Sequence, residues 1–212
     1  MRTAAYELFV AQGYAPTTMG QIAAHAGVAV QTLHFTFHTK AELLKEVMHV
    51  YAAGEDDPAP VMDRSWVREA IATPNGLRQL ALNVEYGIEI YRRMAPLSPA
   101  VSAAATVDAE VAAIWSTIAR DRRAGMAVMV EALAGKGGLR PGLDAKRATD
   151  LTAVLNSHET FLGLTAAAGW SVEAYKAWLY LTLCDQLLAP TPDADRVAAT
   201  AGFTYEAELT RR

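Results

Sequence analysis

The chain has 212 residues, of which 52% are hydrophobic and 20% are charged, and its formal net charge is -4. A chain of this length can bury a sizeable core. Its mild negative charge excludes a basic nucleic-acid coat and a charge-driven disordered chain. The single cysteine, Cys184, excludes an internal disulfide and a cysteine-based zinc site.

Two long uncharged stretches do not favour a membrane span. The first, residues 8–39, contains glutamines, threonines, prolines, glycines and histidines, which are costly to transfer into hydrocarbon. The second, residues 94–107, is interrupted by Pro96 and Pro99. The N-terminus lacks the basic-then-apolar pattern of a secretory signal. We therefore expect a cytoplasmic protein with no membrane contact.

Apolar residues recur at spacings of three and four, and alanine is frequent, which predicts an all-α fold. The first helix is expected to end at Gly13. A capping box, Thr18 to Gln21, opens a second helix that Gly27 ends. A third helix is expected over residues 29–36. A second capping box, Thr39 to Glu42, opens a fourth helix through about Tyr51.

Beyond a break at residues 54–60, we expect a larger helical body. Its predicted helices are 63–72, one opened by Thr73 and Pro74 and running to about 93, then 107–134, 144–169 and 171–188. Residues 94–105 are expected to form a connector with one helical segment. The polar tail is expected to be ordered only in part. The predicted domains are therefore 1–53, 54–192 and 193–212.

The segment from Thr17 to Glu42 has the proportions of a helix-turn-helix, with a tight turn at Gly27. Leu33 and Phe37 would pack the second helix of the pair against the core. The opposite face of that helix would then be free to enter a DNA major groove. Gln31 is the candidate for bidentate hydrogen bonds to adenine, and Val30 for a thymine methyl. The residues expected to contact DNA are Thr18, Ala29, Val30, Gln31, Thr32, His34, Phe35 and Lys40, with Lys40 on a phosphate.

In order and spacing, this stretch resembles the DNA-binding domain of TetR-type transcriptional repressors. The matching residues are Ala4 to Phe9, Gly13-Tyr14, Thr17-Thr18, Ile22-Ala23, Ala26 to Val28, Thr32-Leu33, Phe37, Thr39-Lys40 and Leu43-Leu44. The resemblance implies a three-helix head, a helical ligand-binding and dimerising domain, and a homodimer on a palindromic operator that a small-molecule effector releases. The residues themselves leave repression and activation open.

Three departures from the family pattern stand out. Ala29 replaces a capping serine, which costs about 1 kcal/mol, His34 replaces a common tyrosine, and the basic arm is reduced to Met1-Arg2. Residues 1–50 also contain as many acidic as basic side chains, whereas a DNA-binding face usually carries a positive excess. This neutrality favours an alternative, a helical small-molecule or protein-binding module that keeps the head without sequence-specific DNA binding.

Catalytic and metal sites find no support in the sequence. The glycines at 135–138 lack the partners of a phosphate-binding loop, and no nucleophile elbow is present. His34 and His38 have a metal-binding spacing, but Phe35 stands where a zinc protease has glutamate. Cys184 lies in an apolar helix and is expected to be a buried, inert thiol. We predict no enzyme activity, no metal and no cofactor.

The larger domain offers candidates for two further roles. The wide apolar arc of the last long helix predicts a four-helix dimer interface shared with the preceding helix, with Leu151, Leu155, Leu162, Leu179, Leu183 and Leu187. Aromatic and methionine side chains suit an effector cavity with few polar anchors. The candidates for lining it are Tyr86, Tyr91, Trp115, Met126, Met129, Asn156, Phe161 and Trp170.

Overall fold

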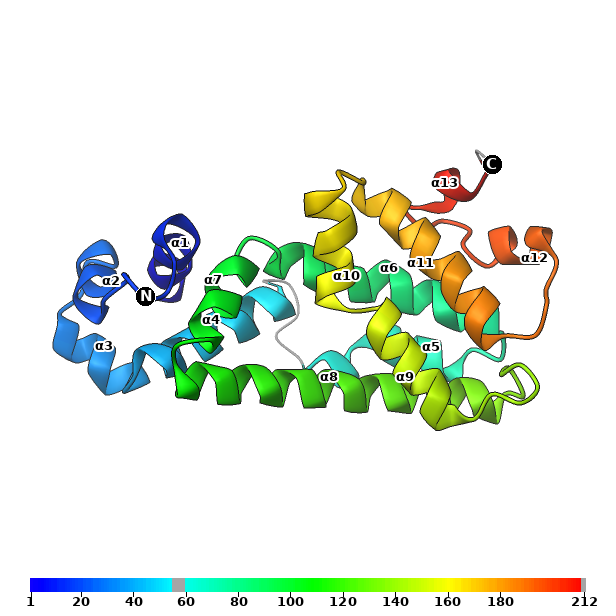
Figure 1. Cartoon of the computed structure of the whole chain (residues 1–212), viewed down its shortest axis with the longest axis horizontal. Coiled ribbons are helices and arrows are strands. Elements are labelled where there is room, and N and C mark those ends of the chain that lie inside the picture. The colour runs from blue at the N-terminus through cyan, green and yellow to red at the C-terminus, as the bar shows by residue number, and fades with distance from the viewer. Residues whose placement is uncertain (55–59, 211–212) are drawn as a thin grey trace. The chain divides into compact units, whose positions relative to one another are not determined.

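A computed structural model describes residues 1–54 and 60–210 of the chain (Figure 1). The described elements are helical, apart from one isolated bridge between Leu139 and Leu188, as the helical spacing predicts. The chain divides into two compact units, Met1–Pro58 with Arg93–Arg120, and Ala59–Arg92 with Asp121–Arg212. The predicted boundary falls at residues 54–60, and residues 55–59 lie outside the described part.

The first unit contains α1 (Arg2–Gln12), α2 (Met19–His25), α3 (Val30–Phe37), α4 (Lys40–Ala53), α7 (Ser98–Ala105) and the first part of α8 (Ala109–Gly135). The predicted stops and starts in its first half are confirmed. Gly13 follows α1 with a φ of 87°, a conformation that favours glycine. Both reciprocal hydrogen bonds of the capping box between Thr18 and Gln21 are present.

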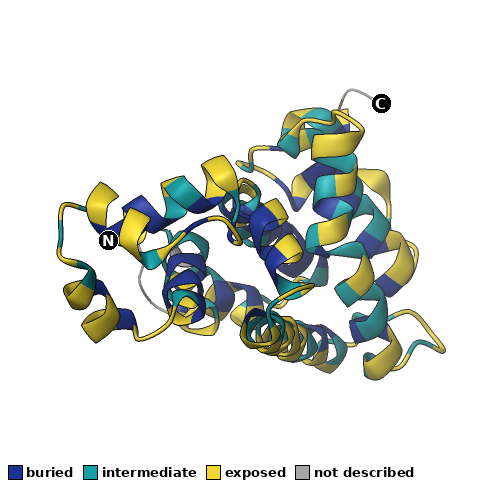
Figure 2. Cartoon of the chain, turned by 60° about the vertical axis from the view of Figure 1, so that its left-hand side comes forward, coloured by how far each residue is buried: buried dark blue, intermediate teal, exposed yellow. Residues whose placement is uncertain are grey.

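A continuous apolar core holds these helices together. Phe9 of α1, Ile22 of α2 and Leu33 of α3 are fully buried, together with Leu44 of α4. Val101 of α7 and Val111 of α8 belong to the same cluster. Each helix thus has a buried side and an exposed side, as the alternation of colours in Figure 2 shows.

The second unit contains a short 3-10 turn (Val61–Asp63), α5 (Ser65–Ala72), α6 (Gly76–Met94), the rest of α8, α9 (Ala145–Leu155), α10 (His158–Leu162), a π-helical turn (Gly163–Ala167) and α11 (Val172–Leu187). The side chains of Asp144 and Ser171 cap α9 and α11 as predicted. No helix of the described residues is long and apolar enough to cross a membrane.

The predicted helix over residues 144–169 is wrong, because the chain bends after Leu155. Ser157 adopts an extended conformation and its hydroxyl accepts the backbone N–H of Thr160, so it caps a new helix, α10. The start of α6 also differs from the prediction. Asn75, rather than Thr73, caps it, with its side-chain oxygen accepting the N–H groups of Leu77 and Arg78.

The chain after α11 is more ordered than we expected. Residues 193–210 contain α12 (Asp193–Ala198) and α13 (Glu206–Thr210). Tyr205 between them is fully buried, and its hydroxyl donates to the carbonyl oxygen of Ala81 in α6. The Arg78 guanidinium lies 4.0 Å from the centroid of the Phe203 ring. Long-range contacts therefore order a segment that reads locally as a polar tail.

Candidate DNA-binding and effector sites

The third helix, α3, is built with one buried face and one open face. Leu33 and Phe37 are buried in the core of the first unit, as predicted. Gln31, Thr32 and His34 are exposed on the outer face. Phe35 beside them is 86% exposed, the most exposed large hydrophobic residue of the described chain. An apolar ring in this position suits contact with another molecule better than contact with water.

The N-terminal end of α3 has no side-chain cap, whereas its C-terminal end is hydrogen-bonded within the chain. Ala29 at its N-cap makes no side-chain cap, so the first N–H groups of the helix remain open to a partner such as a phosphate. At the other end His38 has a φ of 50°, and the Nδ1 atom of His34 lies 3.2 Å from the His38 carbonyl oxygen. Val30 is half-buried, and Thr18 at the start of α2 is exposed.

Lys40 differs from the other predicted DNA-contacting residues because its charged group is engaged within the chain. Its Nζ atom donates to the carbonyl oxygens of Tyr14 and Thr17, each at 2.8 Å. It also lies 4.0 Å from the centroid of the Tyr14 ring. Burial lowers the pKa of Lys40, while the charge of Asp108 acts in the opposite direction. The phosphate contact of Lys40 stays a prediction, and any such contact would be made by an ammonium that already has partners.

Other charges of the first unit are paired with one another. Arg2 lies 3.1 Å from Glu46, and the Nε2 atom of His25 lies 2.6 Å from a carboxylate oxygen of Glu7. Both pairs are exposed, so each contributes little to stability. Their consequence is electrostatic, because they leave little uncompensated positive charge on the first four helices.

The eight predicted effector residues do not form one group. Tyr91, Met126, Asn156 and Phe161 lie together in the second unit, where Tyr91 donates a hydrogen bond of 2.8 Å to the Asn156 carbonyl oxygen. Tyr86 packs against Trp66 and Phe203, and Trp170 against Trp178. Trp115 packs on the core of the first unit. Met129 offers its carbonyl oxygen to Gln79.

Arg122, which was not among the predicted effector residues, lies inside the group around Tyr91. Its Nη1 atom donates to the Tyr91 hydroxyl at 3.2 Å and to the Asn156 carbonyl oxygen at 2.8 Å, and lies 3.9 Å from the Met126 sulfur. One signal could have revealed it. Arg122 lies four and seven residues before Met126 and Met129, so it is a charge on an otherwise apolar stripe of a long helix.

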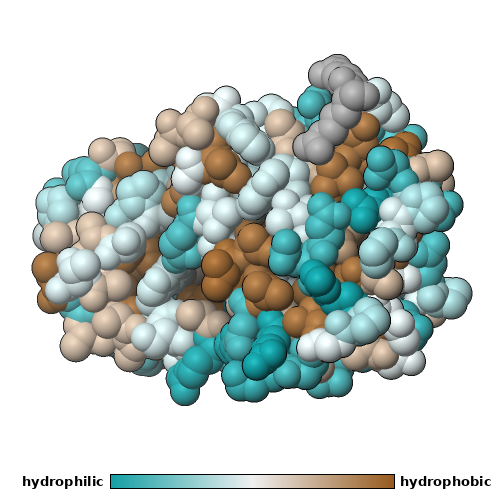
Figure 3. All heavy atoms as spheres, turned by 45° about the vertical axis from the view of Figure 1, so that its right-hand side comes forward, coloured by the Kyte–Doolittle hydropathy of each residue, from teal (hydrophilic) through white to brown (hydrophobic). Residues whose placement is uncertain are grey.

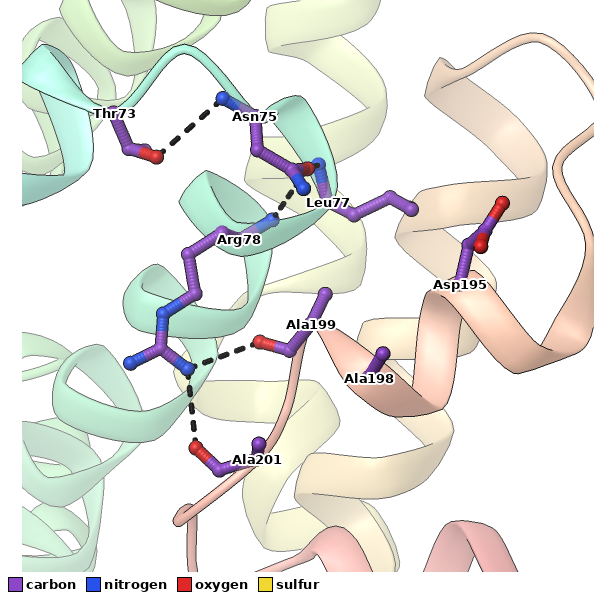
Figure 4. Close-up of a pocket in the computed structure, with 8 residues that line it drawn as sticks. All are labelled: Thr73, Asn75, Leu77, Arg78, Asp195, Ala198, Ala199 and Ala201. Atoms are coloured by element: carbon purple, nitrogen blue, oxygen red, sulfur yellow. Dashed lines mark hydrogen bonds between the residues drawn. The ribbon is translucent and has the colours of Figure 1, made fainter.

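None of the eight residues lines either of two cavities in the structure. One cavity, of about 570 Å³, lies between the start of α6 and α12 (Figure 4). Two of its polar side chains are already engaged, because Asn75 caps α6 and Arg78 donates to the carbonyl oxygens of Ala199 and Ala201. The other, of about 560 Å³, lies in the first unit between the end of α1 and α7.

The predicted dimer residues fall into two classes. Leu179, Leu183 and Leu187 of α11 are buried within the chain, with at most 2% of each exposed, so they have no surface left to bury against a partner. Leu151, Leu155 and Leu162 are half-buried. Val154 in the same region is 69% exposed. Figure 3 shows hydrophobic side chains in separate patches among polar ones on the face that it views.

The chemistry of other groups is limited. Cys184 is buried, as predicted, and burial raises its pKa to about 11, so the reactive thiolate is scarce at neutral pH. The described residues include no cluster of three or more histidine, cysteine, aspartate or glutamate side chains suited to a metal ion.

Known proteins share the N-terminal sequence pattern and the overall fold of this chain. Residues 2–47 match the family model of bacterial regulatory proteins of the TetR family. No curated protein matches the chain. A transcriptional regulator from Saccharomonospora viridis, solved in complex with choline, is 18% identical, with 89% of this chain and 96% of that chain covered and a TM-score of 0.66.

Two further solved structures are described as TetR-family transcriptional regulators. The protein from Mesorhizobium loti is 20% identical over 86% of this chain and 90% of its own, with a TM-score of 0.65. The protein from a Rhodococcus species is 14% identical over 86% and 93%, with a TM-score of 0.62. Residues 2–47 therefore form a DNA-binding domain of the TetR type, and the chain shares its all-α fold with these regulators.

Proposed function

We propose that this protein is a ligand-responsive repressor that binds a palindromic DNA operator as a homodimer. The observation that carries the proposal is the outer face of α3, where Gln31 and Phe35 are exposed while Leu33 and Phe37 anchor the helix from behind. In this arrangement, the helix enters the major groove and its outer side chains meet base edges. The two copies of α3 in a dimer would read successive major grooves about one helical turn apart.

The dimer is proposed to form through the side of the second unit that carries α9 and α10. Half-buried Leu151, Leu155 and Leu162 and exposed Val154 support this choice, since exposed apolar surface gains free energy when a partner covers it. α11 would take part through its half-buried residues, Trp178 and Leu181, in place of the buried leucines. The remainder of the interface follows the predicted four-helix arrangement.

A small molecule is proposed to control the DNA affinity. The Saccharomonospora viridis regulator of the same fold was solved with choline, which supports a small-molecule site in a body of this type. Binding in the second unit would shift the long helices, alter the spacing of the two heads and change DNA affinity by a coupling free energy of about 1–3 kcal/mol.

The low free positive charge of the first four helices supports a second candidate function. Arg2 and His25 face carboxylates, and the Lys40 ammonium binds backbone carbonyls. This observation favours a helical module that binds small molecules or proteins through the same body without sequence-specific DNA contact.

A gel-shift titration with DNA from upstream of its own gene separates the two functions. Binding of that DNA in the presence of excess unrelated duplex supports the regulator, and the Gln31→Ala, Phe35→Ala double variant should lose the preference. Equal affinity for both DNAs, or none for either, would favour the second function. Analytical ultracentrifugation of the same samples tests the dimer, and a monomer at micromolar concentration would contradict it.

A further inference from the structure

The strongest unexplained group in the second unit is the guanidinium of Arg122. Every hydrogen bond that it makes among the described residues comes from Nη1, to Tyr91, Ala153, Asn156 and the Met126 sulfur. All these acceptors are neutral. No carboxylate of the described residues lies within ion-pair distance of Arg122, although its neighbour Arg123 pairs with Asp150. A half-buried cation without a counterion is costly.

The remaining edge of this guanidinium is open. Nε and Nη2 of Arg122 have no hydrogen-bond partner among the described residues. They are not among the fully buried side-chain atoms that lack a partner, which in this part of the chain are the side-chain oxygens of Asn83 and Asn156. Nη1 is thus held by carbonyl oxygens and the Tyr91 hydroxyl, while the Nε–Nη2 edge makes no hydrogen bond within the described part of the chain. That edge presents two parallel N–H donors, the geometry that binds a carboxylate with two hydrogen bonds.

The surroundings of Arg122 are apolar and aromatic. The Tyr91 ring lies 5.6 Å from His158 and 6.1 Å from Phe161, measured between centroids, and Met126 lies on the next turn of α8. Burial raises the pKa of Tyr91 and lowers the pKa of His158, which keeps both rings neutral near pH 7. Glu159 is the nearby carboxylate whose charge acts on both rings, and it is exposed.

Asn156, whose backbone carbonyl oxygen accepts from Arg122, also carries an unsatisfied side-chain atom. The side-chain oxygen of Asn156 is buried and has no hydrogen-bond partner among the described residues. A buried acceptor without a donor costs about 1–3 kcal/mol. Asn156 ends α9 at the bend before α10, and a π-helical turn follows α10. A π-helical turn of this kind is frequent at functional sites.

We propose that Arg122 is the anion-recognition residue of the effector site and that the effector is a carboxylate with an apolar, ring-sized body. The ligand enters as α10 shifts, because Tyr91, Phe161 and the Asn156 side-chain oxygen are otherwise buried. Its carboxylate then binds the Nε–Nη2 edge, its body packs against Tyr91, Phe161 and Met126, and Asn156 accepts a hydroxyl or N–H donor where the ligand has one. The ligand's role as an effector rests on the proposed function. The binding site itself rests only on Arg122 and Asn156. A quaternary ammonium ion, being a cation, is excluded by the same charge.

The test compares three probes of nearly equal size on the full chain. Phenylacetate carries the anion, phenylacetamide is its neutral counterpart and benzyltrimethylammonium is a cation. Thermal shift and isothermal titration calorimetry are run at constant ionic strength. Phenylacetate should raise the melting temperature and bind with measurable heat, while the other two should not. Equal shifts with phenylacetamide, or no shift with phenylacetate, would overturn the proposal.

Variants assign the binding to Arg122. Arg122→Gln should weaken phenylacetate binding at least about tenfold. Arg122→Lys should weaken it less, because the positive charge and N–H donors remain while the two parallel donors of the guanidinium are lost. Arg123→Gln removes the adjacent arginine, whose partner is Asp150, and should bind like the unaltered protein. Equal affinity in the Arg122→Gln and Arg123→Gln variants would refute the site. Should Arg122→Gln not fold, the three probes and Arg122→Lys decide the question.

DNA binding is measured separately, so the two proposals can fail independently. A chain that binds phenylacetate through Arg122 but no upstream DNA keeps this site and loses the proposed repressor. A chain that binds its upstream DNA but no phenylacetate keeps the repressor and loses this site.

Discussion

The ammonium of Lys40, at the first residue of α4, lies 4.0 Å from the centroid of the Tyr14 ring, which follows α1. The Tyr14 hydroxyl in turn donates to Asp108, 3.0 Å away, just before α8. These contacts connect three segments of the first unit that are far apart in the sequence. Lys40 therefore has a structural role in the head besides any contact with DNA.

Replacing Lys40 should lower both stability and DNA affinity. Lys40→Met removes two hydrogen bonds to carbonyls and a cation–π contact, and we expect a loss of about 1–3 kcal/mol in the free energy of unfolding. Operator and unrelated DNA should be weakened alike, since a phosphate contact carries no sequence information. Lys45→Met makes the same charge change on the exposed side of α4 and should leave stability unchanged in urea titrations. A stable Lys40→Met protein would contradict the structural role.

Gln31→Ala should relax base preference at one position in each half-site. The side chain is exposed on α3, and a glutamine amide can bind adenine with two hydrogen bonds worth about 1–3 kcal/mol of discrimination. Competition gel shifts with single-base operator variants measure the preference. Thr36→Ala is a matched control, because its hydroxyl is already bonded to the Thr32 carbonyl oxygen. Retention of the full preference in Gln31→Ala would show that another residue reads that base.

The salt dependence of operator binding should be shallow. Arg2 is paired with Glu46 and the Lys40 ammonium is bound within the head, so few cations are free to displace counterions from DNA. We expect a slope of log affinity against log salt weaker than that for about six phosphates. Glu46→Gln should free Arg2 and steepen the slope. A steep slope in the unaltered protein would mean that these pairs open on DNA.

The caps show how much of the fold could be predicted from the sequence. Gly13, Thr18, Asp144 and Ser171 end or start helices as expected, because a cap depends on one residue and the three or four beside it. The bend at Asn156 was not predicted. Its carbonyl oxygen is held by Tyr91 and Arg122, which come from helices far away in the sequence.

The candidate sites divide in the same way. The outer face of α3 could be predicted, since helical spacing fixes which residues flank Leu33 and Phe37. The effector residues could not be grouped from the sequence, because aromatic residues look alike whether they pack on Trp66, as Tyr86 does, or beside Arg122. The three leucines of α11 show the limit of a wide apolar arc, which predicts burial but does not say by which chain.

His38 holds strained backbone that glycine would relieve. Its φ of 50° and ψ of -60°, with Thr39 N–H bonded to the Phe37 carbonyl oxygen, describe a γ-turn that non-glycine residues rarely adopt. We expect His38→Gly to stabilise the protein by about 1 kcal/mol, less the entropy that glycine adds to the unfolded chain. His49→Gly, at an ordinary helical position of α4, should destabilise it. Thermal unfolding of both variants measures the difference, and a loss of stability in both would show that the turn is not strained.

Lys176→Met should destabilise the second unit, and the effect should shrink in acid. The buried Lys176 ammonium lies 2.8 Å from Glu89, 3.4 Å from Glu85 and 3.1 Å from the Thr204 hydroxyl. Removing it leaves carboxylates in a poorly solvated place, which costs about 3–5 kcal/mol for a buried pair.

The pH dependence follows from the pKa of Glu89. Burial raises this pKa, but the hydrogen bonds from Lys176 and Arg92 lower it by more, so the pKa lies below its usual value. A lowered carboxylate pKa contributes stability that is present above the unfolded pKa and is lost as pH falls through the folded pKa. Urea titrations across that range should therefore bring Lys176→Met closer to the unaltered protein as the Glu89 carboxylate becomes neutral. Lys146→Met removes an exposed partner of Asp150, so its free energy of unfolding should differ little from that of the unaltered protein at any pH. If the stability lost in Lys176→Met stays constant into acid, the loss comes from packing and not from unpaired charge.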